Sequence, residues 1–183
     1  MPESIEIVSE WVETFREDVE VLKRVVSDEA VSEDARKYAA AALNYLVSRM
    51  DLIPDWTETI GVVDDVMILR TCVALANQYG LHEDLHDADA LVAVGRLANE
   101  ADRIEAILGH DLEAKLRTFC GRLIDTAVRG RTPDLIVTEA DARAKLYEEV
   151  DEDLKRLPPA TFSDGDAVKA KLVSYLTAKL KDL

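Results

Sequence analysis

Apolar residues recur along most of this chain at alternating steps of three and four, the spacing of one face of an α-helix. The clearest stripe, near the N-terminus, consists of Ile5, Val8, Val12, Phe15, Val19, Leu22 and Val26. A second stripe beside it contains Ile7, Trp11, Val21 and Val25. The helix predicted over residues 5–26 therefore has more apolar surface than one neighbouring helix can cover. We expect it to pack against two helices, or against one helix and a partner protein.

Residues that start and end helices divide the rest of the chain. Ser32 is suited to cap a second helix that runs to about Met50. The third helix is expected to begin at Asp64 or Asp65 and to end before Gly80, because glycine readily adopts the left-handed conformation that follows many helices. Further apolar stripes predict four more helices, over residues 91–108, 112–127, 139–157 and 164–180. The first two of these four end at glycines, Gly109 and Gly130.

The stripes predict an all-α fold of about seven helices in a single domain, residues 1–183. The best strand candidate, "DLIVT" at residues 134–138, is only a few residues long. Thr138, followed by Asp141, resembles a capping box for the sixth helix, and Ser163 or Asp164 is expected to open the last. We expect the C-terminal helical pair, residues 133–183, to pack on the hairpin that the second and third helices form.

Charge narrows the classes of partner. The chain has 37 acidic and 22 basic residues, a formal net charge of −15. Phosphate backbones and anionic lipid surfaces repel such a chain, so general binding to nucleic acid or to a membrane surface is not expected. An acidic excess of this size favours solubility or a basic partner.

The location predicted for the chain is the cytoplasm. The N-terminal sequence "MPESIEIVSE" has neither the basic segment nor the apolar run of a secretory signal. The longest apolar stretch, residues 60–76, contains three charged residues and is not a membrane span. Cys72 and Cys120 lie within helical stripes without a CxxC spacing, so we expect buried free thiols.

The connection between the second and third helices carries a family resemblance. The segments "YLVSRMDLIPDW", residues 45–56, and "IGVVDDVMIL", residues 60–69, resemble the YkvA-like family, a bacterial domain of unknown function. The positions that match its pattern are Asp51, Leu52, Ile53, Pro54, Asp55, Gly61, Asp64 and Asp65. The chain departs from the pattern just before Asp51, where Arg49 and Met50 replace a proline and an aliphatic residue. The resemblance covers about residues 37–75 and implies a helical hairpin but no reaction.

Elementary physics favours a structural role for this corner, which comprises Asp51, Pro54, Asp55, Trp56, Gly61, Asp64 and Asp65. Asp55 and Asp64 are short acceptors near helix starts, where free backbone N–H groups stabilise a carboxylate. Pro54 is expected to end the second helix. Leu52, Ile53 and Trp56 are then free to fold back over the hairpin.

Two other interpretations of the corner are open. Asp51, Asp55, Asp64 and Asp65 could bind a divalent cation such as Mg²⁺ or Ca²⁺, although the spacing is not that of an EF-hand. Arginines at positions 36, 49 and 70 could neutralise the same carboxylates instead. The apolar residues of the corner could dip into a membrane surface, but the carboxylates around them oppose this.

The segment "HEDLH", residues 82–86, matches the His-Glu-x-x-His motif of zinc metallopeptidases. In that interpretation His82 and His86 bind zinc, Glu83 activates water, and Glu105 is the third ligand. However, Gly80 predicts a helix end just before the motif, so the two histidines are not expected to share one helix face. The neighbouring aspartates, residues 84, 87 and 89, are better explained as charges at the start of the next helix.

A local concentration of basic residues consists of Lys115, Arg117, Arg122, Arg129 and Arg131. We expect these side chains to pair with the acidic first helix. The alternative is a patch that binds an anion or an acidic partner.

Together these features predict a non-catalytic cytoplasmic protein without a cofactor, an interaction or adaptor module that binds a partner or itself through helical surfaces. The residues expected to form that surface are Trp11, Phe15, Val19 and Leu22. The competing hypothesis is a zinc-dependent hydrolase that uses His82, Glu83 and His86.

Overall fold

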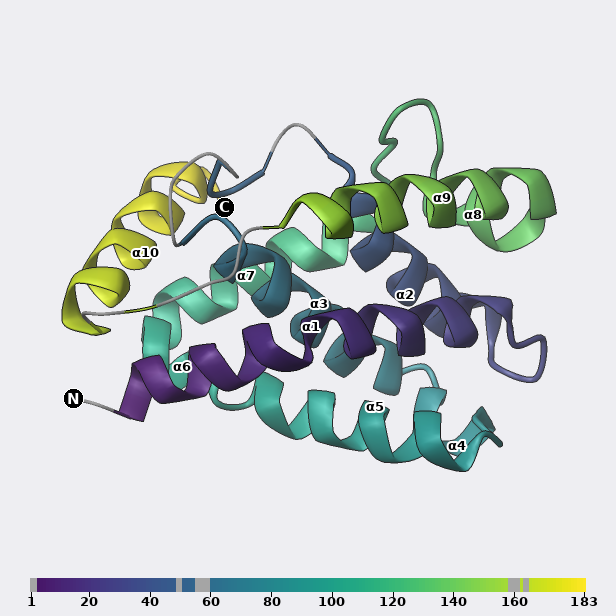
Figure 1. Cartoon of the computed structure of the whole chain (residues 1–183), viewed down its shortest axis with the longest axis horizontal. Coiled ribbons are helices and arrows are strands. Elements are labelled where there is room, and N and C mark those ends of the chain that lie inside the picture. Colours follow the sequence, from purple (N-terminus) through teal and green to yellow (C-terminus); the bar gives the residue numbers. More distant parts are fainter. Residues whose placement is uncertain (1–2, 49–50, 55–59, 158–161, 163–164) are drawn as a thin grey trace.

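The computed structural model describes residues 3–48, 51–54, 60–157, 162 and 165–183, with the side chains of residues 3–5 left out. Within these ranges the chain forms ten helices and no β-strand (Figure 1). The helices are α1 (Glu3–Ser27), α2 (Glu33–Leu46), α3 (Val63–Asn77), α4 (Leu81–Asp84), α5 (Ala88–Ala101), α6 (Ile104–Leu108), α7 (His110–Leu123), α8 (Pro133–Thr138), α9 (Ala140–Arg156) and α10 (Gly165–Lys179).

The all-α fold is confirmed, and the long helices α1, α2, α3, α5, α7, α9 and α10 are those that the apolar stripes predict. The helix predicted over 91–108 is in fact two, because the chain turns at Asp102 and Arg103 between α5 and α6. Periodicity does not show this break, since Ala101, Ile104 and Leu108 stay buried on both sides of it.

Some predicted helix ends are confirmed. The Ser32 hydroxyl accepts a hydrogen bond from the Ala35 N–H at 3.3 Å and caps α2. Gly80 has a φ of +82°, the left-handed conformation expected after α3. Two other ends were predicted too late: α2 ends at Leu46, well before Pro54, and α7 ends at Leu123, before Gly130.

The segment "DLIVT" is not a strand but most of the short helix α8. Thr132 caps this helix by accepting a hydrogen bond from the Leu135 N–H at 3.2 Å, and Pro133 occupies its first turn. The Thr138 hydroxyl donates to the Asp134 carbonyl at 3.0 Å, so the predicted capping box is wrong. Glu139 precedes α9 without a side-chain cap.

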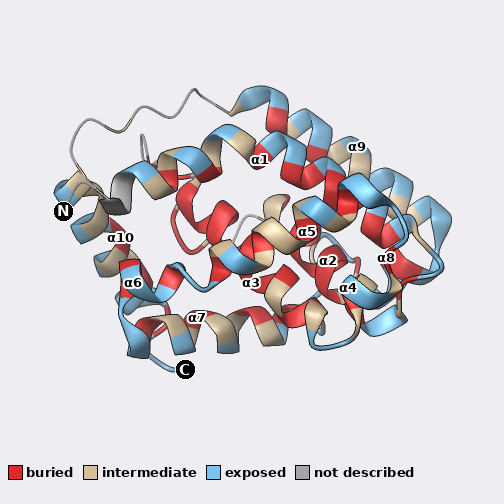
Figure 2. Cartoon of the chain, turned by 90° about the horizontal axis from the view of Figure 1, so that it is seen from below, coloured by how far each residue is buried: buried red, intermediate tan, exposed pale blue. Residues whose placement is uncertain are grey.

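Helix α3 is central. It packs against α1, α2, α5 and α7, and it is buried on every side along most of its length. Buried residues therefore concentrate on α2 and α3 in Figure 2. Helices α8 and α9 lie on α2, whereas α10 packs against α1, α6 and α7, so residues 133–183 do not pack as one pair on the hairpin.

The apolar face of α1 is covered inside the chain. The residues predicted to form a partner surface are at most 2% exposed: Trp11, Phe15, Val19 and Leu22. Helix α1 contacts α2, α3, α5 and α10, so its two stripes are filled by neighbouring helices. The four residues belong to the core, and any partner surface of this protein lies elsewhere.

Among the described residues, no helix is long and apolar enough to cross a membrane.

Candidate functional site

The corner between α2 and α3 is closed by a buried hydrogen-bond cluster. The Tyr45 hydroxyl donates to the Asp64 Oδ2 at 2.7 Å and accepts from the Leu52 N–H at 2.7 Å. The Ile53 N–H donates to the same Asp64 oxygen at 3.1 Å. Because Leu52 and Ile53 are themselves buried, these bonds hold the corner against the start of α3.

Among the described residues, no lysine or arginine forms an ion pair with Asp64. Burial raises the pKa of its carboxyl to about 7, and the hydrogen bonds from Tyr45 and Ile53 oppose that shift only in part. Burial also raises the pKa of the Tyr45 hydroxyl, as does the neighbouring Asp64. The carboxyl of Asp64 therefore takes up a proton far more readily than an exposed aspartate.

The structure describes most, but not all, of the remaining corner residues. Gly61 and Asp65 are buried, Asp51 and Pro54 are half-buried, and Asp55 and Trp56 lie outside the described residues. In the part of the chain that is described, no three histidine, cysteine, aspartate or glutamate side chains come together in a way that could hold a metal ion.

The His-Glu-x-x-His segment does not form a zinc-binding helix face. His82 and Glu83 lie in the four-residue helix α4, and His86 follows outside the helix. All three are exposed, and the His86 Nδ1 lies 2.7 Å from the Asp84 carbonyl oxygen. The Glu105 Oε1, on α6, lies 3.3 Å from the His110 Nδ1. The expected role for Asp87 is confirmed, since it caps α5 by accepting from the Ala90 N–H at 3.0 Å.

The group of basic residues on and near α7 pairs with residues outside α1. Arg129 and Arg131 bind Glu149 of α9, and Arg117 binds Glu113 of its own helix. Lys115 donates to the Leu180 carbonyl at 3.2 Å. The acidic residues of α1 are therefore not neutralised by this group, and the expected pairing with α1 is wrong.

A second polar cluster, which we call the ion network, joins α1, α3 and α5 and is partly buried. Its members are Asp18, Arg70, Arg96 and Glu100. Asp18 binds Arg70 at 3.2 Å and also contacts Arg96, while Glu100 lies 2.8 Å from Arg70 and 3.1 Å from Arg96. The Thr14 hydroxyl donates to Asp18 at 2.9 Å.

Arg70 is the centre of the ion network and has no exposed surface. Its guanidinium lies over the Trp11 ring, 4.8 Å from the centroid, and donates to the Val66 carbonyl at 3.1 Å. Burial lowers the pKa of Arg70, and the charges of Glu100 and Asp18 oppose this shift. Sequence reasoning missed the network, although Asp18 occupies a buried helix position seven residues from both Trp11 and Val25. A charged residue within an apolar helical stripe therefore indicates a buried ion pair.

Three ion pairs between α1 and the segment that contains α5 show how the two helices run relative to each other. Arg24 binds Asp87 at 2.8 Å, Asp18 binds Arg96, and Glu10 lies 3.9 Å from Arg103. As residue numbers fall along α1 they rise along α5, so the two helices run antiparallel side by side (Figure 1).

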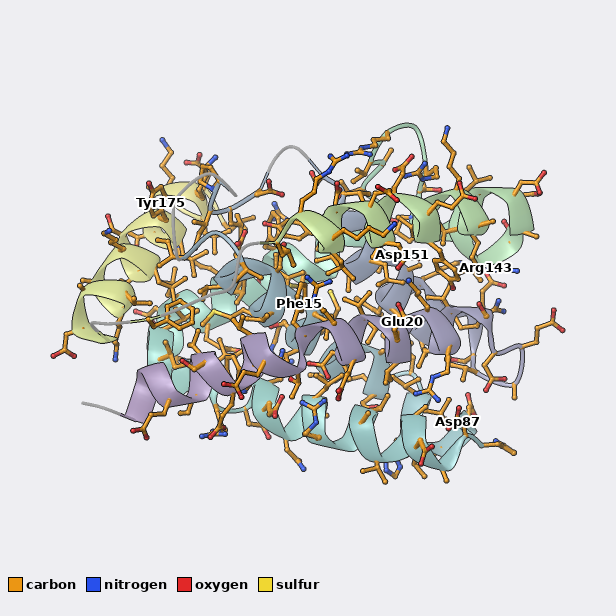
Figure 3. All side chains as sticks on the ribbon, in the orientation of Figure 1. Phe15, Glu20, Asp87, Arg143, Asp151 and Tyr175 are labelled. Carbon is orange, nitrogen blue, oxygen red and sulfur yellow. The ribbon has the colours of Figure 1, made fainter. Side chains whose placement is uncertain are left out.

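Between these two helices lies an open groove of about 390 Å³, which we call the α1/α5 groove. Its lining consists of Glu17, Asp18, Glu20, Val21, Arg24, Asp89, Ala93 and Arg96. The ion network closes its inner side through Asp18 and Arg96. In Figure 3, Glu20 lies on α1 between Asp151 of α9 and the start of α5 beside Asp87.

The surface of α1 next to the groove is a row of glutamates at helical spacing, all of them exposed: Glu6, Glu10, Glu13, Glu17 and Glu20. We call this row the acidic ridge. It spans about 21 Å at 1.5 Å per residue. Glu17 and Glu20 belong to both the ridge and the lining of the groove, so the row of carboxylates on α1 continues into the groove.

Comparison with known proteins finds one family. The model described as "Protein of unknown function (DUF1232)" matches residues 35–69, from the start of α2 through the corner to the middle of α3. No curated protein and no solved structure matches the chain. The α1/α5 groove lies outside the matched residues. The YkvA-like resemblance is thus confirmed for the segment that holds Tyr45 and Asp64 together, and it names a family of unknown function.

Proposed function

We propose that this protein is a non-catalytic cytoplasmic interaction or adaptor module that binds a protein partner at the α1/α5 groove. The observation that carries the proposal is the groove itself, which is open and large enough to receive side chains of a partner. The free thiols of Cys72 and Cys120, both buried, suit the reducing environment of the cytoplasm.

The composition of the groove favours a protein partner. Val21 and Ala93 contribute apolar surface to the lining, and charged side chains surround them. Val92, on the same side of α5 as Asp89 and Arg96, is 74% exposed and extends this apolar surface outward. An apolar centre with a charged rim is the usual composition of a protein interface.

Site-specific photocrosslinking in cells of the source organism tests the proposal. A photoreactive amino acid at Val92 is expected to give protein-sized adducts on illumination, because this position borders the groove. The matched control places the same amino acid at Thr118, which is exposed on α7. Adducts of equal yield from both positions, or none from Val92, would contradict the proposal.

A further inference from the structure

The chemistry of the α1/α5 groove indicates what kind of partner it fits, on the assumption that the proposed binding function is correct. Both cations of the groove are already held by carboxylates of this chain. Arg24 pairs with Asp87, and Arg96 pairs with Asp18 and Glu100. Neither cation is therefore left to attract an acidic ligand.

The carboxylates of the groove are in excess. Among the described residues, Glu17 and Asp89 form no ion pair, and Glu20 shares Lys23 with Asp151. The acidic ridge continues the same charge along α1. This surface therefore favours a positively charged partner, because like charges placed across an interface cost several kcal/mol.

Shape sets the size of the partner segment. The groove runs from Glu17 to Arg24 on α1 and from Asp89 to Arg96 on α5, about 10 Å or two helical turns along each helix. With the ridge included, the surface runs from Glu6 to Arg24 along α1, about 27 Å, and fits about five turns of a helix. A helix with one apolar side would place that side on Val21, Val92 and Ala93.

We propose that the α1/α5 groove binds a basic amphipathic helix of another protein, whose lysines and arginines pair with Glu17, Glu20 and Asp89. A second copy of this chain is a poorer occupant, because its net charge of −15 opposes close approach to the acidic ridge.

The probe is a fluorescent peptide of 18 residues, about five turns of helix. It consists of leucine and lysine, spaced so that the leucines share one face of the helix. Two control peptides have glutamate in place of lysine, or the same composition in scrambled order. Binding is measured by fluorescence anisotropy at an ionic strength of about 0.1 M, where the Debye length is about 10 Å.

The test variant is Glu17→Lys/Asp89→Lys, and both of its positions are exposed. The control variant, Asp111→Lys/Asp125→Lys, makes the same change of net charge at exposed positions on and just after α7. We expect the test variant to weaken binding of the amphipathic peptide at least about tenfold, and the control variant to change it less than about twofold. Circular dichroism and melting curves verify that both variants fold.

Four results would overturn the inference. Equal weakening by both variants would mean general charge attraction, and equal binding of the scrambled peptide would exclude a helical ligand. Displacement of the peptide by spermidine at similar concentration would point to a small cation. A dimer of the unmodified protein that Glu17→Lys/Asp89→Lys dissociates would point to a second copy. Adducts from Val92 in the crosslinking experiment would leave the binding function intact in each of these cases.

Discussion

Asp18 and Asp64 are both buried carboxylates, and the protein accommodates them in opposite ways. Asp18 contacts two guanidinium groups, those of Arg70 and Arg96. Asp64 accepts hydrogen bonds from the neutral Tyr45 hydroxyl and the Ile53 N–H. A buried charge must be paired or neutralised, since the interior solvates it poorly. The ion network pairs its carboxylate with cations, whereas burial in the corner raises the pKa of the Asp64 carboxyl.

The difference assigns separate roles to the two regions. The ion network connects three helices that are distant in sequence and forms the inner side of the α1/α5 groove. The corner connects two consecutive helices within the segment that matches the family model. We therefore expect the network to govern global stability, and the corner to make stability depend on pH.

The largest effect is expected from removal of the central cation. Arg70→Met would leave the buried Asp18 and the partly buried Glu100 with Arg96 alone. We expect it to lower the free energy of unfolding by about 3–5 kcal/mol. Urea denaturation measures this change. Arg96→Met is the matched control and should cost less, because the Arg96 side chain is 35% exposed. Equal losses from the two variants would mean that burial of Arg70 does not set its contribution.

A smaller loss is expected at the corner. Tyr45→Phe removes a donor to Asp64 and the acceptor of the Leu52 N–H, which leaves buried polar groups unsatisfied. We expect it to lower the free energy of unfolding by about 1–3 kcal/mol. Tyr175→Phe, on the half-buried face of α10, serves as the control and should be nearly neutral. If Tyr45→Phe leaves the free energy of unfolding unchanged, the hydrogen-bond cluster does not stabilise the corner.

The smallest effect is a change in pH dependence. The pKa of Asp64 in the folded protein is about 7, above its ordinary value of 3.8, so folding favours the protonated form. The stability that this proton contributes is fully present below about pH 4 and is lost as the pH rises through about 7.

Asp64→Asn replaces the carboxyl by a neutral amide of similar size, which cannot titrate. The free energy of unfolding of the unmodified protein, minus that of Asp64→Asn, is therefore expected to fall by about 1 kcal/mol or more between pH 4 and pH 7. Taking the difference cancels the other titrating groups. A difference that rises with pH, as for a salt-bridged aspartate, would show that Asp64 is charged when buried.

Local sequence was sufficient for most elements of the fold. The stripes at steps of three and four predict the long helices, Ser32 and Gly80 mark two of their ends correctly, and the corner motif predicts the hairpin. Short helices escaped prediction because α4, α6 and α8 contain too few residues for a period to show. The end of α2 at Leu46 was also missed, since no helix-breaking residue stands there.

Only the tertiary structure decided which element each helix face packs against. The sequence by itself determined that α1 has two apolar stripes, but it left open whether a partner or the chain itself covers them. The tertiary structure covers them with α2, α3, α5 and α10. In the same way, Asp18 and Arg70 lie at helical positions among apolar residues, while their partners come from distant parts of the chain. Charge pairing depends on distances across the fold, and those distances arise only when the helices pack.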